Sequence, residues 1–461
     1  MKLERNQGKP GLPFPERKAP EAGAPMRLTV IGAGYLGLTH AVCMADLGHH
    51  VLAIDVDAAR IARAAAGEAP FFEPGLEALL RKNTDARRLR FTTSFAEVGA
   101  FGDVHFLCVG TPQGGDGAAD LSFVHAAAGA LAPHLQRPAL IAGKSTVPVG
   151  TARSLLTGLR AAAPAGDGVD LAWNPEFLRE GHAVQDSLTP DRFVFGVTSP
   201  SAERLLRRVY ARPLAAGTPA LVMDLETAEL VKVSANAFLA TKISFINAMA
   251  EVCEAAGADV VRLAEALGHD ERIGRKSLGP GLGFGGGCLP KDIRAFRATA
   301  AGLRVTSVAS LLAVVDAINL GRRDRVLDLA RTAAGGTLSG LRVAVLGIAF
   351  KPNSDDVRDS PSLDVCERLT AAGALVSVHD PVAMPNAARQ RPDLRYAASV
   401  SEAAEGADLL LHLTEGTPGV DDGPLGRVVA QRTVIDARCA LDARLWQAAG
   451  WSVHVLGLGR P

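Results

Sequence analysis

Short apolar runs alternate along the chain with longer segments in which apolar residues recur at helical spacing. The first run, Arg27–Ile31, is followed by a glycine turn and by a helical pattern that ends at Leu47. Strands that alternate with helices form parallel sheets, so the pattern predicts an α/β fold. Six more runs continue it: Val51–Ile54, Val104–Val109, Ala139–Ala142, Leu171–Trp173, Phe193–Val197 and Leu221–Met223.

The second half of the chain repeats this pattern after a long helical block. Residues 226–256 contain neither proline nor glycine, which predicts one helix of about 45 Å, and a second helical segment covers 305–334. From Leu341 a helix at 361–372 accompanies five strand-like runs: Val343–Gly347, Leu375–Val378, Leu409–Leu413, Thr433–Ile435 and Val453–Leu456. We therefore predict two Rossmann-like, doubly wound domains joined by a long central helix, over 26–225, 226–334 and 335–461.

Composition and charge argue against two classes of protein, those that bind nucleic-acid polymers and those that span a membrane. The 461 residues are enough for two or three domains. The 49 basic and 49 acidic residues give zero net charge, which argues against binding a nucleic-acid polymer. Lys242 and Asp316 interrupt the two most apolar stretches, so we expect no membrane span.

The N-terminus and the cysteines indicate where the protein works. Residues 1–25 are charged and rich in proline, with no apolar core, which predicts a disordered tail and not a signal peptide. The six cysteines are scattered and form no CxxC pair. This is typical of thiols in a reducing compartment, so we expect a cytoplasmic protein with no bound metal.

The first glycine turn has the pattern of a dinucleotide-binding site. Gly32, Gly34 and Gly37 form a GxGxxG sequence between a strand and a helix, and Asp55 ends the next strand. Glycines let the backbone approach a pyrophosphate, and an acid at this distance favours a ribose hydroxyl over a phosphate. An ordinary strand-to-helix turn is the alternative. The second α/β unit has no such turn, so we expect it to bind something other than a dinucleotide pyrophosphate.

Cys288 follows the segment of the chain that is densest in glycine, since six of the nine residues 279–287 are glycine. A cysteine is usually a small buried hydrophobe, and we expect that of the other five. The bare backbone before Cys288 lets a ligand approach, and Lys291 and Asp292 follow it closely. A nearby ammonium favours the thiolate, so this pattern favours a nucleophile.

Two further groups of polar residues fall where ligands collect. Lys232 and Asn236 are four residues apart on the long helix, so they share a face and could donate to a developing oxyanion. Glu176 and Thr146 each follow a predicted strand, which puts both at the carboxyl edge of the sheet. The structural alternatives are a lysine that snorkels to solvent, an acidic first helical turn and a helix cap.

These segments together resemble the UDP-glucose/GDP-mannose dehydrogenase family over residues 26–440. DGAADLS at 116–122, PDRFVFG at 190–196 and CLPKD resemble the UDP-glucose branch most. One departure is Gly287, which stands where many members have serine. The motifs follow the family order: GAGYLG at 32–37, VGTP at 109–112, KSTVPVG at 144–150, NPEFLREG at 174–181, ETAELVKVSANAFLATKISFIN at 226–247, GFGGGCLPKD at 283–292 and GIAFKPNSDDVRDSP at 347–361.

The resemblance implies an enzyme that oxidises the primary alcohol of UDP-glucose, or of a related nucleotide sugar, to a carboxylate with two NAD+. Cys288 would form a thiohemiacetal and then a thioester, with Lys232 and Asn236 stabilising the anionic oxygen. Asp292 would assist with water or protons. Glu176 and Thr146 would position the water that hydrolyses the thioester.

The resemblance also implies binding residues, with the nucleotide-diphosphate half of the substrate in the C-terminal domain. Arg272 matches an arginine donated across a dimer interface, so a homodimer or a higher homo-oligomer is expected. The NAD positions are Gly32, Gly34, Tyr35, Leu36, Gly37, Asp55, Thr111, Thr146, Glu180, Lys291 and Arg358. The substrate positions are Glu176, Phe177, Leu178, Glu180, Lys232, Asn236, Arg272, Phe284, Gly285, Lys351 and Arg438.

Three other functions stay open at this point. GDP-mannose or another nucleotide sugar could be the substrate of the same mechanism. A two-electron hydroxyacid-type dehydrogenase would leave Cys288 with a structural role. An inactive nucleotide-sugar sensor is the third, although such a protein would not need a nucleophile, donors and acids together.

Overall fold

The computed structural model describes residues 24–459, in two compact units. Unit 1 contains the residues up to 112 and 120–232, and unit 2 contains 113–119 and the residues from 233 onward. The boundary falls inside helix α10 (Leu225–Ala256), which therefore contributes to both units. Most of the expected N-terminal tail lies outside the described residues.

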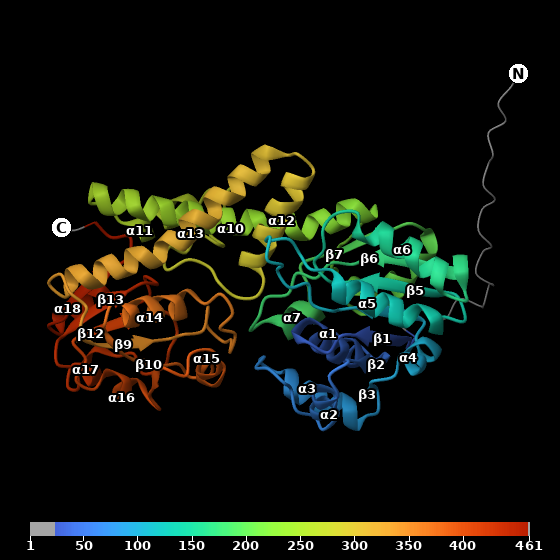
Figure 1. The fold of residues 1–461 in the computed structure, drawn as a ribbon, viewed down its shortest axis with the longest axis horizontal. Helices are drawn as coiled ribbons and strands as arrows, with labels where there is room; N and C mark the ends of the chain where they lie inside the picture. The colour runs from blue at the N-terminus through green and yellow to red at the C-terminus, as the bar shows by residue number, and fades with distance from the viewer. Residues whose placement is uncertain (1–23, 460–461) are drawn as a thin grey trace, which may run out of the picture. The chain divides into compact units, whose positions relative to one another are not determined.

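The sheet of unit 1 has the strand order β3-β2-β1-β4-β5-β6-β7-β8 (Figure 1). All seven runs that the sequence predicts here form strands, with ends shifted by at most two residues. The pattern does not predict β3, a four-residue strand with alternating polar residues. The strands are β1 (Arg27–Ile31), β2 (His50–Ile54), β3 (Leu89–Thr92), β4 (Val104–Leu107), β5 (Ala139–Gly143), β6 (Val169–Trp173), β7 (Phe193–Val197) and β8 (Ala220–Met223).

Two apolar cores cover the two faces of this sheet. Val51 and Ala53 of β2 belong to one core, and Leu52 and Ile54 belong to the other, because successive side chains of a strand point to opposite faces. The helices are α1 (Tyr35–Asp46), α2 (Ala58–Ala65), α3 (Leu76–Asp85), α4 (Phe95–Phe101), α5 (Ser122–Leu131), α6 (Thr151–Ala162), α7 (Ala183–Leu188), α8 (Pro200–Val209) and α9 (Ala211–Ala215).

The expectation of a parallel sheet is wrong at one pair of strands. β6 and β7 are antiparallel, with Ala172 opposite Val197 and Trp173 opposite Gly196. A parallel connection needs a crossover that returns the chain to the other edge of the sheet. The connection 174–192 contains only the short helix α7, so the chain re-enters the sheet from the edge at which β6 ends.

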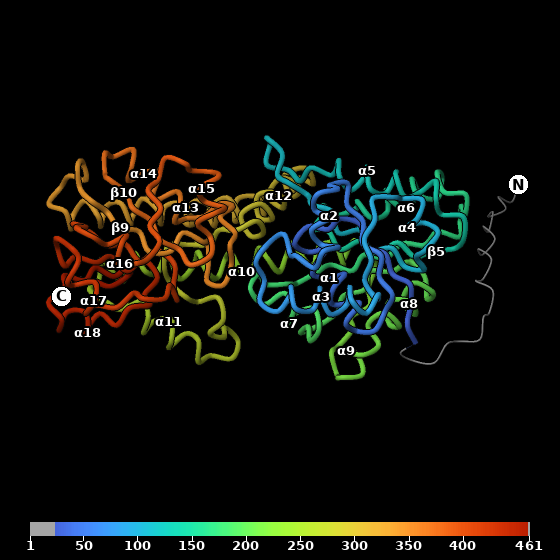
Figure 2. Tube along the Cα trace, turned by 90° about the horizontal axis from the view of Figure 1, so that it is seen from below, coloured from blue at the N-terminus to red at the C-terminus, as the bar shows by residue number. Residues whose placement is uncertain are grey.

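Unit 2 contains a six-stranded sheet in the order β11-β10-β9-β12-β13-β14, and its strand pairs are parallel. Val343 and Val345 of β9 face a core shared with α14 (Pro361–Ala371). Ala344 and Leu346 face a core shared with α16 (Val400–Ala404) and α18 (Ala443–Ala448). Figure 2 shows α14 and α18 on opposite sides of the strands. The strands are β9 (Arg342–Leu346), β10 (Leu375–His379), β11 (Arg395–Tyr396), β12 (Leu409–His412), β13 (Thr433–Asp436) and β14 (Ser452–Val455).

The helices of unit 2 include the two long ones that the sequence predicts. In this unit α10 packs on α13 (Thr306–Ala333), where the Ser244 hydroxyl donates to the Val315 carbonyl at 2.8 Å. The predicted architecture, two Rossmann-like domains and a long central helix, is thereby confirmed. The remaining helices are α11 (Val260–Gly268), α12 (Leu289–Gly302), α14 (Pro361–Ala371), α15 (Met384–Gln390), α16 (Val400–Ala404), α17 (Asp422–Leu425) and α18 (Ala443–Ala448).

The strand order fixes where ligands can collect in each unit. In both sheets the first strand of the unit lies between its second and fourth strands, so the chain winds outward in two directions from that point. In such sheets the crevice at the carboxyl ends of the strands, where the winding direction changes, is the ligand site.

The end of β5 gives a test of the packing of unit 1. A Cβ added at Gly143 would lie 2.1 Å from the ring of Trp173, which is 1% exposed. We expect Gly143→Ala to lower the free energy of unfolding by about 1–3 kcal/mol through overpacking. Gly158→Ala in α6 is the control, because no described atom lies within 4 Å of its Cβ, and it should raise stability by about 0.5–1 kcal/mol. Chemical denaturation measures both, and equal effects would contradict the packing described.

Candidate functional site

The glycine turn after β1 is a backbone cradle. Gly32 has φ +97° and donates its N–H to the Ile54 carbonyl at 2.8 Å. A Cβ at Gly37 would lie 1.8 Å from the Gly32 carbonyl oxygen, so only glycine allows this approach. No described side chain caps the first turn of α1, which leaves its N–H groups for an anion.

Asp55 supports the same turn from the end of β2. Its carboxylate accepts the N–H groups of Ala33 at 2.7 Å and Asp57 at 3.0 Å, and Arg60 Nη1 lies 3.0 Å away. Burial raises the pKa of this carboxyl, but these hydrogen bonds and the Arg60 charge outweigh burial and hold the pKa below its usual range. The turn and Asp55 thus fit the pyrophosphate and the ribose of a dinucleotide.

The corresponding turn of unit 2 is built differently at its acid. Gly347 donates to the His379 carbonyl at 2.8 Å, as Gly32 does to Ile54. Asp380, however, accepts four backbone N–H groups, from Ile348 at 2.9 Å, Ala349 at 3.0 Å, Val382 at 3.0 Å and Ala383 at 2.8 Å. It is 2% exposed and is bound to its own chain.

Glu176 is the central acid of unit 1. Its carboxylate lies 2.9 Å from Lys232 Nζ and accepts the Leu178 N–H at 2.6 Å. Burial raises the pKa of this carboxyl, and the charge and hydrogen bond of Lys232 outweigh it, so the pKa lies below its ordinary value. The side chains of Glu176 and Lys232 are 12% and 6% exposed. The structure therefore brings together an acid and a base that the sequence analysis named separately.

Neighbouring residues in unit 1 fix the strand ends around this pair. Thr111 donates its hydroxyl to the Thr146 carbonyl at 2.8 Å, which ties the segment after β4 to the segment after β5. The ring of Phe177 lies 5.8 Å from Lys232 Nζ. Glu180 is buried four residues further along the chain, in a segment that is not helical.

Glu73 is a positioning residue that the sequence analysis missed. It is 6% exposed and accepts the N–H groups of Gly181 and Ala183, each at 2.7 Å. It also accepts the Tyr35 hydroxyl, so it links the dinucleotide turn to the segment that carries Glu180. Burial and this bond raise the pKa of Tyr35. Its only signal in the sequence is an acid between Phe72 and Pro74.

Cys288 lies at the start of α12 in unit 2. It is the N-cap residue of this helix, and it is exposed. One turn later, Asp292 is 2% exposed; it accepts Asn236 Nδ2 at 2.7 Å and Lys291 Nζ at 2.5 Å. A helix N-terminus favours a negative charge, so the position of Cys288 suits a thiolate.

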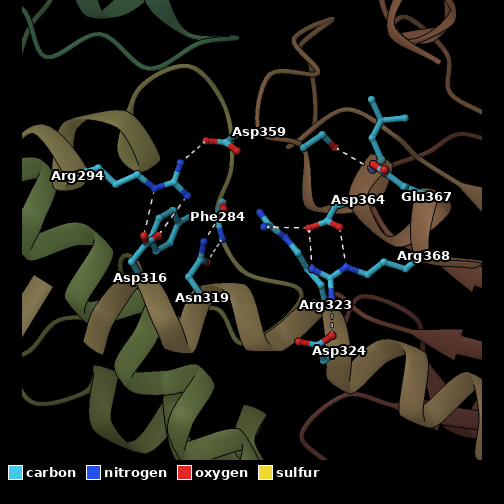
Figure 3. A network of polar contacts seen from close by, with 12 residues as sticks. Phe284, Arg294, Asp316, Asn319, Arg323, Asp324, Asp359, Asp364, Glu367 and Arg368 are labelled. Atoms are coloured by element: carbon cyan, nitrogen blue, oxygen red, sulfur yellow. Dashed lines mark hydrogen bonds and ion pairs between the residues drawn. The ribbon is translucent and has the colours of Figure 1, made fainter. Parts of the chain in front are cut away.

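The loop before Cys288 is held by side chains that bind its backbone. Asn319 of α13 accepts the Phe284 N–H at 2.7 Å and donates to the Phe284 carbonyl at 3.0 Å (Figure 3). Asn247 of α10 accepts the Gly281 N–H at 2.9 Å, and Arg438 donates to the Gly283 carbonyl at 3.1 Å. The loop thus has anchors from α10, α13 and the end of β13.

Ion pairs fix the helix that follows the loop. Figure 3 shows Arg294 of α12 between Asp316 of α13 and Asp359 of the segment after β9. Its guanidinium lies 3.1 Å from each carboxylate. The N–H of Gly286 also donates to the Arg358 carbonyl at 2.9 Å. These contacts connect the helix, the loop and the segment after β9 within unit 2.

Of the other predicted residues, Lys351, Arg358 and Arg438 lie near the glycine loop, and Arg272 does not. Lys351 and Arg358 lie in the segment after β9, where Lys351 Nζ is 5.3 Å from the centre of the Phe350 ring. Arg438 is almost buried and holds the glycine loop. Arg272 is different, because its side chain is 88% exposed and pairs with Asp270. The structure does not bring Arg272 to the residues around Cys288 within unit 2.

The chain is similar to known proteins over most of its length. The chain matches three domain profiles of the UDP-glucose/GDP-mannose dehydrogenase family: the NAD binding domain at 26–214, the central domain at 226–320 and the UDP binding domain at 344–443. It is 41% identical to UDP-glucose 6-dehydrogenase YwqF of Bacillus subtilis over 394 residues, and these cover 85% of this chain and 88% of that protein.

Two further relatives support the match. A UDP-glucose 6-dehydrogenase of Rhizobium meliloti is 44% identical over 394 residues, which cover 85% of this chain and 89% of that protein. The structure of a UDP-glucose dehydrogenase from Pyrobaculum islandicum matches with a TM-score of 0.88 at 37% identity, over 96% of this chain and 99% of that one. Within residues 24–459, no helix is long and apolar enough to cross a membrane.

The exposure of Cys288 predicts selective alkylation. Burial raises the pKa of four other thiols, those of Cys43, Cys108, Cys366 and Cys439, to about 12, and it also raises the pKa of Cys253. We expect iodoacetamide at neutral pH to modify one thiol per native chain, within the peptide that contains Cys288. Mass spectrometry locates the adduct, and Cys288→Ala is the control. Rapid modification of a second thiol would contradict the burial described.

Two glycines of the loop give a matched pair of variants. A Cβ at Gly285 would lie 2.4 Å from the Asp359 carbonyl oxygen, which is backbone and cannot move alone. A Cβ at Gly287 would lie 2.3 Å from the guanidinium carbon of Arg358, at the end of a flexible side chain. We expect Gly285→Ala to lower the unfolding free energy by about 1–3 kcal/mol, and Gly287→Ala by less. Equal losses would show that Arg358 is fixed over the loop.

Proposed function

The chain belongs to the UDP-glucose/GDP-mannose dehydrogenase family, and we propose that it oxidises UDP-glucose to UDP-glucuronate with two NAD+. The observation that carries the proposal is the exposed Cys288 thiol at the N-terminus of α12, after a loop whose backbone is fixed by Asn247, Asn319 and Arg438. A fixed loop and an accessible thiol are what covalent catalysis requires.

The first half of the reaction converts the primary alcohol to an aldehyde and captures it. When bound, NAD+ accepts one hydride in each of two oxidation steps. The hydroxyl proton of the alcohol leaves by way of Asp292. The Cys288 thiolate then adds to the aldehyde carbon, so that a C–S bond forms and the carbonyl oxygen becomes an alkoxide. This adduct keeps the aldehyde from leaving before the second oxidation.

Lys232 and Asn236 would stabilise the oxygen of this adduct. Asn236 Nδ2 gives one of its two N–H groups to Asp292, which leaves one for the alkoxide. The Lys232 ammonium lies 2.9 Å from the Glu176 carboxylate, which orients it. Donors already fixed by acids need little reorganisation when charge develops on the oxygen.

The second half releases the acid. Loss of the second hydride from the adduct, whose oxygen is already an alkoxide, leaves a thioester on Cys288. Water then attacks the thioester carbon, the C–S bond breaks, and the carboxylate and the thiolate are released with two protons. Glu176, held ionised by Lys232, accepts the first of these protons, and Thr146 helps to hold the water.

GDP-mannose is the second candidate substrate, since the same thiol chemistry would oxidise it. We favour UDP-glucose because the relatives at 41% and 44% identity are named UDP-glucose 6-dehydrogenases. We also propose that the protein forms a homodimer in which Arg272 reaches the partner's site. The exposed Phe238 and Phe245 on α10, 66% and 49% exposed, support an apolar interface there.

The yield of NADH decides between these functions. We expect two NADH per UDP-glucose, measured by absorbance with limiting sugar, and slower reaction with GDP-mannose and with UDP-N-acetyl sugars. One NADH per substrate would indicate a two-electron dehydrogenase. Binding of every sugar without turnover would indicate a sensor.

The role of the thiol has its own test. We expect Cys288→Ala to abolish net formation of UDP-glucuronate, because no adduct can form, while UDP-glucose still binds in isothermal titration. Cys253→Ala is the matched control, since that thiol is buried within the core around α10 and α11. A Cys288→Ala variant with full activity would contradict covalent catalysis.

A further inference from the structure

Lys144 is a buried ammonium to which the proposed reaction assigns no role. It directly follows β5 and is 7% exposed. Its Nζ lies 3.1 Å from Asn174 Oδ1, 3.3 Å from the Asn174 carbonyl oxygen and 3.5 Å from the Tyr210 hydroxyl. These acceptors are neutral. Burying a charge costs folding free energy unless the charge is paired with an opposite one. A lysine kept at this position therefore suggests a functional role.

The hydrogen bonds of Lys144 fix the start of the segment that carries Glu176. Asn174 is the first residue after β6, two positions before Glu176. Its N–H donates to the Gly143 carbonyl at 2.8 Å, its Oδ1 accepts the Tyr210 hydroxyl at 2.6 Å, and its Nδ2 donates to the Val194 carbonyl at 3.0 Å. Lys144 Nζ donates to both oxygens of Asn174, so every polar group of Asn174 has a hydrogen-bond partner.

Two charged groups act on Lys144, because its other titratable neighbours are neutral at pH 7. Burial raises the pKa of Cys108 to about 12 and raises that of Tyr210 well above its usual value, while burial and the charge of Lys144 lower the pKa of His40. These three side chains, which lie just after β4, at the end of α8 and within α1, are therefore neutral at pH 7. Glu176 and Lys232 are the remaining charged groups that act on Lys144.

Glu176 accordingly stands in a buried region with two ammonium groups. Lys232 touches its carboxylate, and Lys144 acts on it from the strand edge; both lower the pKa of Glu176. Burial lowers the pKa of Lys144 to about 8, which leaves it mostly protonated at pH 7. The extra positive charge favours an ionised acid and opposes its protonation.

We propose that Lys144 is a positioning residue for Glu176, which it serves by fixing Asn174 and by keeping the Glu176 carboxylate ionised. The inference rests on the proposed function, in which Glu176 accepts a proton during thioester hydrolysis. Lys144 does not contact the reacting atoms in this scheme. It acts through the chain between β6 and Glu176 and through its charge.

The test compares Lys144→Met and Lys144→Gln, which remove the charge, with Tyr210→Phe. The last variant disturbs the same hydrogen bonds and leaves the charge in place. We expect the acid limb of the kcat–pH profile to move to higher pH by about one unit in both Lys144 variants, with KM for NAD+ and UDP-glucose little changed. In Tyr210→Phe the acid limb should stay at the wild-type pH.

An unmoved acid limb in the Lys144 variants, or an equal shift in Tyr210→Phe, would overturn the electrostatic role. If neither Lys144 variant folds, Lys144 is needed for the stability of the sheet edge. That result would also overturn the electrostatic role. The wild-type profile tests the proposed function separately, because an inactive wild type would contradict that proposal alone.

A second readout does not depend on activity. A carboxyl with a lowered folded-state pKa stabilises the fold at neutral pH, and this stability is lost as pH falls through that pKa. Lys144 is protonated in both the folded and the unfolded state below pH 7, so its own titration adds no slope there. We expect the Tm of the wild type to fall relative to the Tm of Lys144→Met as the pH drops from 7 to 4. A constant difference between the two Tm values would overturn the inference.

Discussion

A loop with six glycines in nine positions has no side chains with which to pack itself, so its position depends on groups that bind its backbone. Asn319 supplies both a donor and an acceptor to Phe284, as a neighbouring strand would. Asn247 and Arg438 hold two further peptide groups. The loop can therefore be bare enough for a ligand to approach and still be ordered. The placement of Cys288 and the helix it begins follows from these few bonds.

Helix α10 shows how one regular element serves two different polar environments. Lys232 lies against Glu176 in unit 1, and Asn236, one turn later, lies against Asp292 in unit 2. Each donor is buried, and each is balanced by an acid that also fixes its direction. Buried polar groups of this kind contribute little to stability unless they are fully bonded. Their arrangement fits the proposed reaction, in which negative charge develops on an oxygen.

The sequence allowed much of this to be predicted, because strands and helices have distinct apolar periods and because the glycine turn has strict local requirements. The direction of β7 could not be predicted, since it depends on which edge of the sheet the chain re-enters. Glu73 and Asn319 escaped notice because an isolated acid or amide becomes informative only when its distant partners are known. The candidate site residues of the two units were identifiable as separate motifs. Their pairing, Glu176 with Lys232 and Asn236 with Asp292, needed the fold.

The two acids that end the second strands of the two sheets differ in what they can still bind. An ionised carboxylate offers about four lone-pair positions. Asp380 uses them on four peptide N–H groups, whereas Asp55 accepts two peptide N–H groups and a partly exposed arginine that can be displaced. Two units with the same strand order can thus bind different ligands, because the carboxylate of one acid already accepts all the hydrogen bonds it can. Capacity for hydrogen bonding, more than strand order, then separates an acid that can still bind a dinucleotide ribose from one that binds only its own backbone.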